Sequence, residues 1–576
     1  MPYISWIPFS LAIRRRRAAS FITVIAAGVF ALASLSGCAS GQAGQDLGQA
    51  HSQGSFGEDK LTVAGSEPIT QFLPGFSQTT SDGYLEDLVF SRLYTNDAQG
   101  RPDYGRDALC ETCRLSEDGR TYTFTLKQAL FSDGASLTAS DVQFSAELTA
   151  NPGYEGPLKG LLQNLEGCDA YAQGKASGIS GIGVVDDQTV SFTFHEPGIA
   201  NFDALGRLHI LPRAYYGEGT TPGDLSGLLR KLQAHDYMGS GRYMVSGQSA
   251  DSVTLIRNPN YFGGAVPIQQ LSYQVLPEEA LIQAFADGKA DALVGLTANT
   301  ANRLSAVSLP DATVVDYWED RYGYIGLQME NPVLRDKAVR QALAYGFDRQ
   351  AFLDAYYGQG NALALAGPFI PPSWAYTDLI APYPYDPAKA NQLLEDAGWV
   401  VQSDSGVRGK NDQILSFSFY ANENSSYVDA LLPMLEENWR RIGVQLTPAR
   451  VSFETLTDTV FNHQSPSMWA MGWTADRSPT SVYSILGIQY SDYGGNNAGH
   501  YHNAIFETLL LDTMRENDPE KQVTALWQAG QILKEDCPYI FIGAAGKMDI
   551  YSTKIQNYNA STYQNWTYSV MDWALR

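Results

Sequence analysis

The sequence has few of the residue types on which enzymes and nucleic-acid-binding proteins depend. Its 576 residues include only seven histidines and five cysteines, and 39 Lys and Arg stand against 62 Asp and Glu, a net charge of −23. Nucleic-acid binding needs cationic side chains that neutralise phosphates, so we predict no nucleic-acid partner. The motifs GxSxG, HExxH and GxxxxGK[ST] are absent. We therefore predict no catalytic residue, no cofactor and no enzymatic activity.

Apolar runs long enough to span a membrane are also rare, and the sequence holds one, near the N-terminus. Four arginines at 14–17 precede an apolar stretch over 18–35, the pattern of a secretory signal. Residues 35–38, Leu-Ser-Gly-Cys, follow and resemble the bacterial lipobox, which implies that a diacylglycerol is attached to Cys38. Two acyl chains anchor a protein stably. The alternative is a transmembrane anchor, for which the run is barely long enough.

This N-terminal segment predicts where the protein works. We expect a lipoprotein signal peptide over 1–37, lipidation at Cys38 and a flexible Gly-, Gln- and Ser-rich tether over 38–57. The body has no second apolar run of about 18 residues and is expected to be soluble. We therefore predict that the lipid holds the protein on the extracytoplasmic face of the cell membrane.

The remaining cysteines suggest disulfides rather than a metal site. Cys110 and Cys113 form a CxxC, but the second CxxC that a zinc site needs is missing. Thiols outside the membrane tend to oxidise, so we expect structural disulfides, with a redox role as the alternative. The pairing stays open between 110–113 with 168–537 and a crossed arrangement.

The two histidines closest together in the sequence do not predict a metal site either. His500 and His502 would share one face of a strand, but only Asp492 offers a third ligand. We interpret this segment as an exposed loop.

Strand and helix patterns alternate along the body, which favours an α/β or α+β architecture in several lobes. Residues 121–126 alternate polar and apolar side chains, as a half-buried strand does. Asp386 and Pro387 provide an N-cap and a first helical position, and Gly398 ends the same helix. Further strands are expected over 61–65 and 183–192, and further helices from Pro277 and over 335–349.

Six segments between residues 116 and 398 resemble, in the same order, the motifs of family 5 extracellular solute-binding proteins. The most characteristic is FSDGASLTASDV at 131–142, which is similar to the family's kFsDGtplTAeDV signature. Most of these motifs set turns, caps and packing faces, so they identify the scaffold rather than ligand contacts. The other five are SEDGRTYTFTLK at 116–127, GSGRY at 239–243, RNPNYF at 257–262, and the segments 336–349 and 386–398.

The resemblance implies an α/β, two-lobed periplasmic-binding-protein (Venus flytrap) fold with an extra domain in the first lobe and a two-crossing hinge. Lobe I is then expected to comprise 58–96, 237–317 and 538–576, and the extra domain 97–236. Lobe II is expected over 318–537.

The resemblance also implies a function, because such proteins capture a solute outside the membrane and deliver it to an ATP-driven permease. Oligopeptides and dipeptides are the family's commonest ligands. We therefore predict an oligopeptide ligand, an ABC permease with its ATPase subunits as partners, and a monomer. The fold does not fix the ligand, so an oligosaccharide, a metal chelate or a peptide-sensing receptor without transport stay open as alternatives. The missing nucleophile motif disfavours a secreted hydrolase.

One segment indicates which ligand the protein binds. Residues 471–481, MGWTADRSPTS, resemble the GWtaDy.dPts segment of oligopeptide-binding members, in which the Asp accepts the peptide's α-ammonium. Asp476 matches that Asp, and a charge-assisted hydrogen bond in a water-poor cleft is short and strong. The resemblance further implies that Trp473 forms an apolar wall and that backbone groups of Gly472, Thr474 and Ala475 pair with the ligand as an added strand. Thr80 is expected to contribute from lobe I.

The segment departs from the family pattern at one position. Arg477 stands where the family has an aromatic residue, and the stretch before Pro479 is one residue shorter. Arg477 beside Asp476 would form a structural salt bridge that competes with ammonium capture. The alternative is that Arg477 faces solvent and leaves Asp476 available.

Overall fold

The computed structural model describes residues 59–462, 466–492, 494–516 and 518–576. The signal peptide over 1–37, the lipidation site Cys38 and the tether over 38–57 lie outside the described residues, so these stay predictions. Within the described ranges, no helix is both long and apolar enough to cross a membrane.

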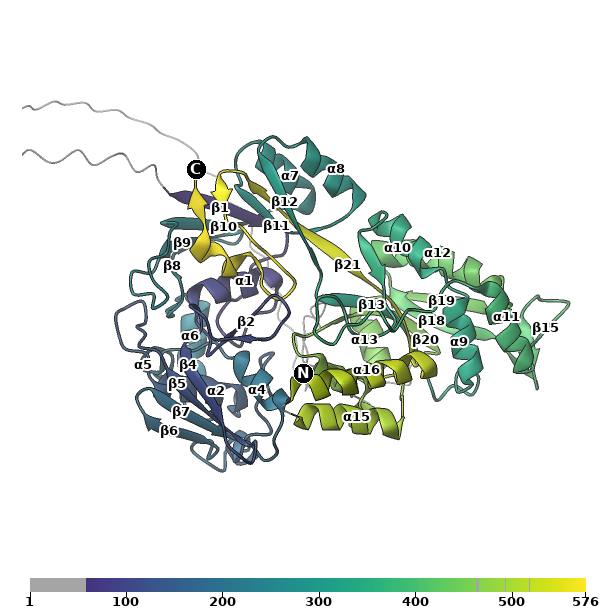
Figure 1. Cartoon of the computed structure of the whole chain (residues 1–576), viewed down its shortest axis with the longest axis horizontal. Helices are drawn as coiled ribbons and strands as arrows, with labels where there is room; N and C mark the ends of the chain where they lie inside the picture. The colour runs from purple at the N-terminus through teal and green to yellow at the C-terminus, as the bar shows by residue number, and fades with distance from the viewer. Residues whose placement is uncertain (1–58, 463–465, 493, 517) are drawn as a thin grey trace, which may run out of the picture.

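The fold is organised around a sheet of twelve strands that both lobes share (Figure 1). Along its main path the strand order is β19-β18-β20-β13-β21-β11-β1-β10-β9-β8, and β12 and β14 pair with β21. The lobe I strands are β1 (Lys60–Gly65), β8 (Tyr243–Gln248), β9 (Ser252–Arg257), β10 (Gln270–Val275), β11 (Ala292–Thr297) and β12 (Ala312–Trp318). The lobe II strands are β13 (Arg321–Leu327), β14 (Ala362–Ala364), β18 (Ser416–Asn422), β19 (Gln445–Val451) and β20 (Met468–Thr474).

The strand β21 (Tyr539–Ser552) belongs to both lobes and forms one of the two crossings. Its first half pairs with β13, up to Gly543, and its second half pairs with β12 from Gly546 onward. The other crossing joins β12 to β13, where the Glu319 N–H donates to the Ala545 oxygen at 2.9 Å. The chain thus returns to lobe I within β21, after Gly543. The expected boundary at 538 lies just before the start of this strand. Two lobes joined by two adjacent crossings confirm the predicted fold class.

Helices cover both lobes and begin and end where local signals place them. The Asp386 carboxylate accepts a hydrogen bond from the Lys389 N–H at 2.8 Å, and Gly398 takes a φ of +85° just after the helix. Lobe I carries α1 (Thr80–Val89), α7 (Glu278–Ala286) and α8 (Thr300–Ser308). Lobe II carries α9 (Lys337–Tyr345), α10 (Arg349–Tyr357), α11 (Pro387–Asp396), α12 (Ser426–Arg440), α13 (Phe453–Asn462), α15 (Ala504–Arg515) and α16 (Pro519–Asp536).

The extra domain forms its own layer of sheet and helix beside lobe I (Figure 1). Its four-stranded sheet has the order β4-β5-β7-β6 and packs against α2. Its helix α4 contacts α15 of lobe II. The elements are β4 (Cys110–Leu115), β5 (Thr121–Leu126), β6 (Ile182–Asp186), β7 (Thr189–Thr193), α2 (Ala139–Ala150) and α4 (Ile199–Gly206).

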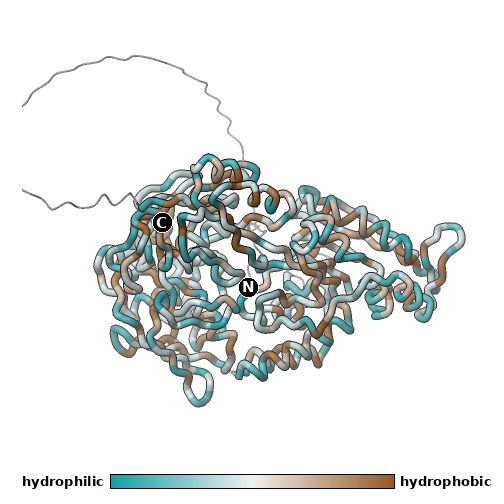
Figure 2. The backbone as a smooth tube through the Cα atoms, turned by 45° about the horizontal axis from the view of Figure 1, so that its top comes forward, coloured by the Kyte–Doolittle hydropathy of each residue, from teal (hydrophilic) through white to brown (hydrophobic). Residues whose placement is uncertain are grey.

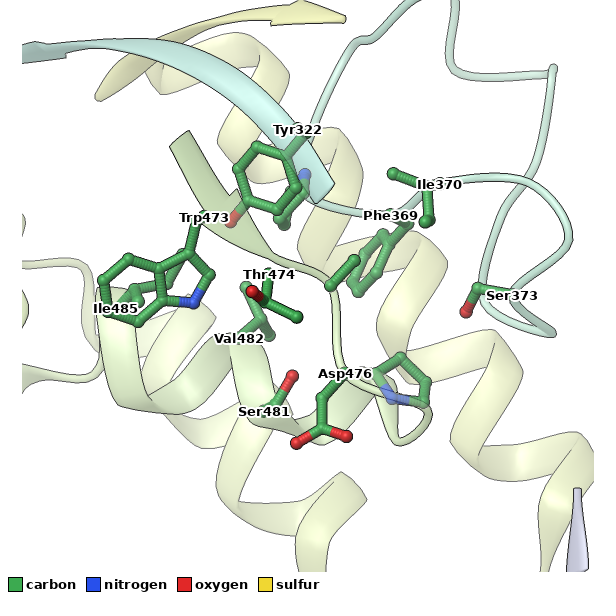
Figure 3. A pocket seen from close by; sticks show the side chains of 13 residues that line it. Tyr322, Phe369, Ile370, Ser373, Trp473, Thr474, Asp476, Ser481, Val482 and Ile485 are labelled. Carbon is green, nitrogen blue, oxygen red and sulfur yellow. The ribbon is translucent and has the colours of Figure 1, made fainter. Parts of the chain in front are cut away.

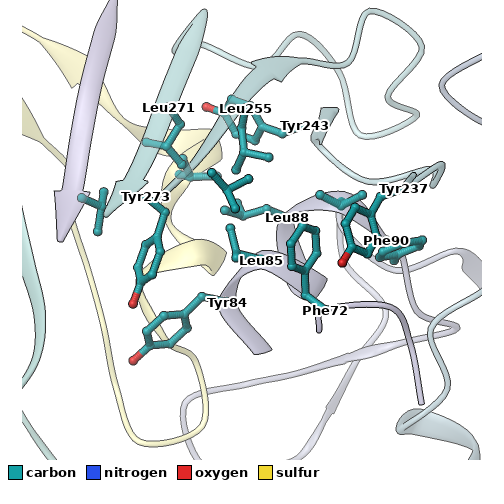
Figure 4. Packing of buried hydrophobic residues seen from close by; sticks show 14 of the residues in the cluster. Phe72, Tyr84, Leu85, Leu88, Phe90, Tyr237, Tyr243, Leu255, Leu271 and Tyr273 are labelled. Atoms are coloured by element: carbon teal, nitrogen blue, oxygen red, sulfur yellow. The ribbon is translucent and has the colours of Figure 1, made fainter. Parts of the chain in front are cut away.

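The apolar residues form several core clusters, and the cluster of lobe I also takes in residues of the extra domain, such as Leu148 and Tyr216. The core of lobe I is rich in aromatic rings, and Figure 4 shows Tyr84 of α1 beside Tyr273 of the sheet, with Phe72 beside Tyr237. Separate clusters fill the extra domain and the two sides of the lobe II sheet. Hydrophobic and hydrophilic residues alternate along the chain in every part (Figure 2), as expected for elements that bury one face only.

The expected disulfides are wrong, because all four described cysteines are free thiols. Cys537 lies in the core of lobe II, whereas Cys168 lies in the core of the extra domain. Cys110 and Cys113 share strand β4, and neither thiol is bonded to the other. Burial raises the pKa of the Cys110 thiol to about 12, so this thiol is a poor nucleophile at neutral pH.

A buried carboxylate on strand β21 of the sheet makes the stability of lobe I depend on pH. Asp549 on β21 has no exposed surface and accepts hydrogen bonds from the Gly295 N–H, the Tyr558 hydroxyl and the Tyr317 hydroxyl at 2.7, 2.8 and 2.9 Å. Burial outweighs these bonds and raises the pKa of Asp549 from 3.8 to about 6. The folded state therefore binds the proton more tightly than the unfolded state does.

We expect the Asp549 contribution to stability to be fully present below about pH 4 and to be lost as the pH rises through about 6. The pKa difference corresponds to about 3 kcal/mol of unfolding free energy. An Asp549→Asn variant should lack this loss, because an amide does not ionise. Urea unfolding between pH 4 and 8 measures it, with the exposed Asp251→Asn as the control. Equal pH slopes for wild type and Asp549→Asn would contradict the prediction.

Candidate functional site

A cavity of about 370 Å³ lies between the two lobes, beside both crossings. Lobe I contributes residues 77–87, around the start of α1, and the strand ends near Gly65 and Gly295. Lobe II contributes Arg321 and residues 474–477, at the start of β13 and the end of β20. The volume is that of a small-molecule site, and a solute held there touches both lobes at once.

The cavity lining is highly charged, with seven carboxylates against five Arg and Lys side chains. Several of these charges already pair with one another, including Arg92 with Asp87 at 2.6 Å and Lys547 with Glu319 at 3.6 Å. The lining carboxylates are Glu67, Glu86, Asp87, Glu278, Glu319, Asp320 and Asp476, and the cations are Arg92, Arg207, Arg321, Arg477 and Lys547. The excess of carboxylates favours a solute with positive charge.

A buried ionic network fixes the wall of the cavity between α1 and the extra domain. The His209 ring lies 2.5 Å from Glu86 Oε1 through Nδ1 and 3.1 Å from Asp87 Oδ1 through Nε2. Arg92 donates to both His209 Nε2 and Asp87. Burial opposes ionisation of Asp87, but the nearby cationic side chains, Arg92 foremost, together outweigh it and lower the pKa of this carboxyl. This wall therefore stays charged and rigid.

The strand β20 enters the cavity with one edge unpaired. It pairs with β13 along its whole length, but with β18 only at Met468 and Trp469. The Ala475 N–H donates to the Asp320 oxygen at 2.7 Å, and hydrogen-bonded positions alternate along an antiparallel pair. The N–H and C=O groups of Gly472 and Thr474 therefore point away from β13, toward the unpaired edge. Such an edge can take up another strand.

The structure brings most of the predicted ligand-binding residues together. Thr80, Thr474, Ala475 and Asp476 line the cavity from the two lobes. Gly472 is exposed on β20 but does not line it. For all six predicted residues, Trp473 included, contact with a ligand stays a prediction.

Trp473 lies away from the main cavity, in the core of lobe II. Its side chain is 3 % exposed and lines a separate space of about 20 Å³, too small for more than a water molecule. Figure 3 shows the indole beside Ile485, with the Asp476 carboxylate on the far side of Val482 and Ser481. Trp473 thus stabilises the loop after β20 by packing in the core of lobe II, in one cluster with Val482 and Ile485.

Asp476 has a cationic partner that sequence analysis missed. One carboxylate oxygen accepts the Arg477 N–H at 2.8 Å, and the other lies 3.5 Å from the guanidinium of Arg207 in the extra domain. The Arg477 guanidinium instead donates to the Asn96 side chain of lobe I at 3.1 Å. No motif surrounds Arg207, so nothing in the sequence indicated this pair.

The comparison with known families decides what kind of protein this is. The family model described as bacterial extracellular solute-binding proteins, family 5 middle, matches residues 106–496. The chain belongs to this family. Its members are solute-binding proteins that work outside the cytoplasm, and the shared cavity between two lobes agrees with such a role.

Relatives of this family 5 protein are distant but cover most of the chain. Heme-binding protein A of Haemophilus influenzae is 24% identical over 474 residues, which cover 79% of this chain and 82% of the relative. The oligopeptide-binding protein AppA of Bacillus subtilis is 24% identical over 501 residues, with coverage of 84% and 86%. The structure of AppA in complex with a nonapeptide superposes with a TM-score of 0.69 at 22% identity, covering 90% of this chain and 99% of AppA.

The cavity of this family 5 protein is equipped to hold a solute. It offers fixed charges from both lobes, tyrosine and threonine hydroxyls, and the unpaired edge of β20. Among the described residues, no group of three or more His, Cys, Asp and Glu side chains is arranged to hold a metal ion.

Proposed function

We propose that this protein captures oligopeptides in the cavity between its lobes and delivers them to an ABC permease and its ATPase subunits. The observation that carries the proposal is the unpaired edge of β20, which ends beside a carboxylate at Asp476. An extended peptide satisfies such an edge through its backbone, whatever its side chains. The names of relatives support the same ligand class, since AppA is an oligopeptide-binding protein.

In this mechanism the two ends of the binding segment have different roles. Asp476 accepts the peptide's α-ammonium, and Gly472 and Thr474 provide backbone partners beside it, whereas the Ala475 N–H is already held by the Asp320 oxygen. Thr80 faces them from the start of α1. A peptide that touches both lobes stabilises the closed form, and the hinge at the two crossings allows the lobes to separate again. The solute leaves unchanged, and the protein works as a monomer.

Peptides fit the cavity better than uncharged oligosaccharides do. A sugar needs stacking rings and neutral hydrogen-bonding groups, whereas this lining carries twelve charged side chains, seven acidic and five basic. A zwitterionic peptide compensates charges of both signs.

Calorimetric titration of the purified protein with a pool of tri- to octapeptides tests the proposal. We expect saturable binding, and the same titration with oligosaccharides or with nickel and heme chelates should give none. Binding of one of these solutes without peptide binding would replace the proposal.

We also propose that Cys38 carries the lipid that keeps the protein at the membrane, on the grounds of the lipobox-like residues before it. A Cys38→Ser variant should move from the membrane fraction to the soluble extracytoplasmic fraction, because the thiol that accepts the acyl chains is missing. Cell fractionation and immunoblotting measure this, with Cys110→Ser as the control. Retention of Cys38→Ser in the membrane fraction would count against lipid attachment there.

A further inference from the structure

A second chamber of about 200 Å³ adjoins the main cavity, between α4 of the extra domain and the loop after β20 in lobe II. Arg207, Asp476 and Arg477 line both spaces, so the chamber and the cavity meet at these three residues. Liquid water occupies about 30 Å³ per molecule, so the chamber has room for roughly six groups of that size. This is enough for one long side chain.

One carboxylate in the chamber has an oxygen without a partner. Asp203 on α4 lines the chamber, and its Oδ2 atom is buried with no hydrogen-bond donor among the described residues. Burial raises the pKa of Asp203 to about 7, against the hydrogen bond from Ser478, and the nearby charge of Asp476 raises it further. A buried polar atom without a partner costs free energy, so a donor from a bound molecule would recover that cost.

The chamber's two cations do not fill this role. Arg207 pairs with Asp476 at 3.5 Å, and Arg477 donates to Asn96 at 3.1 Å. Arg207 lowers the pKa of Asp203, but too little to offset its burial. Asp203 therefore adds an eighth carboxylate to the seven of the cavity, against the same five cations.

The chamber walls suit an organic cation as well. Three tyrosines, Tyr94, Tyr483 and Tyr490, line it. Aromatic faces attract ammonium and guanidinium groups, more strongly where water is excluded. The Tyr94 and Tyr483 hydroxyls are held elsewhere, by the Phe202 carbonyl and by Glu507. The Tyr94 ring also stacks on Phe202 with centroids 4.5 Å apart, so Tyr483 and Tyr490 are the rings that remain for a ligand.

We propose that this chamber is a subsite for the ammonium or guanidinium group of a basic side chain of the bound solute, with Asp203 as its acceptor. The inference rests on the proposed peptide-binding function and narrows it to a preference for cationic peptides. The peptide backbone lies along β20, and a lysine or arginine side chain passes the three shared residues into the chamber.

Matched peptides test the subsite. Tripeptides of alanine with a single lysine at each position in turn are compared by calorimetry at pH 8 with the same peptides carrying norleucine, which keeps the methylenes and lacks the charge. We expect lysine to bind about ten- to a hundredfold more tightly than norleucine at one position, as a charge-assisted hydrogen bond provides. Asp203→Asn should remove this preference and leave norleucine peptides unchanged, and the exposed Asp187→Asn should keep it.

The outcomes separate this inference from the proposed function. Equal binding of lysine and norleucine peptides, or a preference that survives Asp203→Asn, overturns the subsite and leaves peptide binding intact. If no peptide binds, arginine amide serves as a probe that needs no peptide site. A rise in melting temperature with arginine amide in wild type, absent in Asp203→Asn, supports the subsite alone, and no rise in wild type overturns it.

Discussion

Replacing Gly326 by alanine is expected to lower the unfolding free energy of lobe II by about 3 kcal/mol. Gly326 lies on β13 opposite Trp469 of β20, whose side chain is fully buried. A Cβ atom at position 326 would lie 2.0 Å from the Trp469 ring. That ring packs edge-on against Tyr539 at 6.2 Å, so it cannot move aside without disturbing the core. Urea unfolding followed by tryptophan fluorescence measures the loss.

A glycine on the neighbouring strand provides the matched control. A Cβ atom at Gly472 would meet only the Tyr322 oxygen, at 3.6 Å, and the position is exposed. Gly472→Ala should therefore unfold close to wild type. If Gly326→Ala unfolds at the same urea concentration as Gly472→Ala, the close packing of Trp469 on β13 is not a requirement of the fold.

Replacing Asp476 by asparagine is expected to weaken the binding of peptides with a free amino group by about a hundredfold. The lost interaction joins two charges inside a cleft, and truncating one partner of such a pair commonly costs 2–5 kcal/mol. Wild type should discriminate against N-acetylated peptides by a similar factor, because acetylation removes the ammonium. Calorimetry of free and acetylated peptides on both proteins measures the effect.

The comparison of the two peptide forms distinguishes ammonium capture from a structural role. The Asp476→Asn variant should bind free and acetylated peptides equally, while Glu278→Gln, at another part of the lining, should keep the preference. A variant that loses affinity for both forms alike would mean that Asp476 serves its salt bridge with Arg207 and not the ligand. The preference of wild type for free peptides is the decisive quantity.

Local signals predicted the elements of this fold well. The helix from Pro387 to Asp396 follows from its cap at Asp386 and its glycine at 398, all within a dozen residues. Strand β5 occupies Thr121–Leu126, the predicted range, because alternation of polar and apolar side chains is visible in the sequence itself. The family motifs then indicated how these elements assemble.

Interactions between segments far apart in the chain could not be predicted from the sequence. Arg207 and Asp476 meet only because the extra domain and lobe II approach each other. The residues around either one in the sequence do not indicate the other as its partner. The chamber around Asp203 arises in the same way. The disulfide expectation failed for a related reason, since the CxxC spacing does not reveal that Cys110 and Cys113 lie on an extended strand.

The place of β21 in the shared sheet also governs the order in which the chain can fold. It follows every other strand of that sheet in chain order, yet it lies at the centre, between β13 of lobe II and β11 of lobe I. A nascent chain that has not yet reached residue 539 leaves both half-sheets with an open edge, and closing them requires contacts between residues far apart in sequence, which form slowly. Completion of both lobes thus waits for the same late segment.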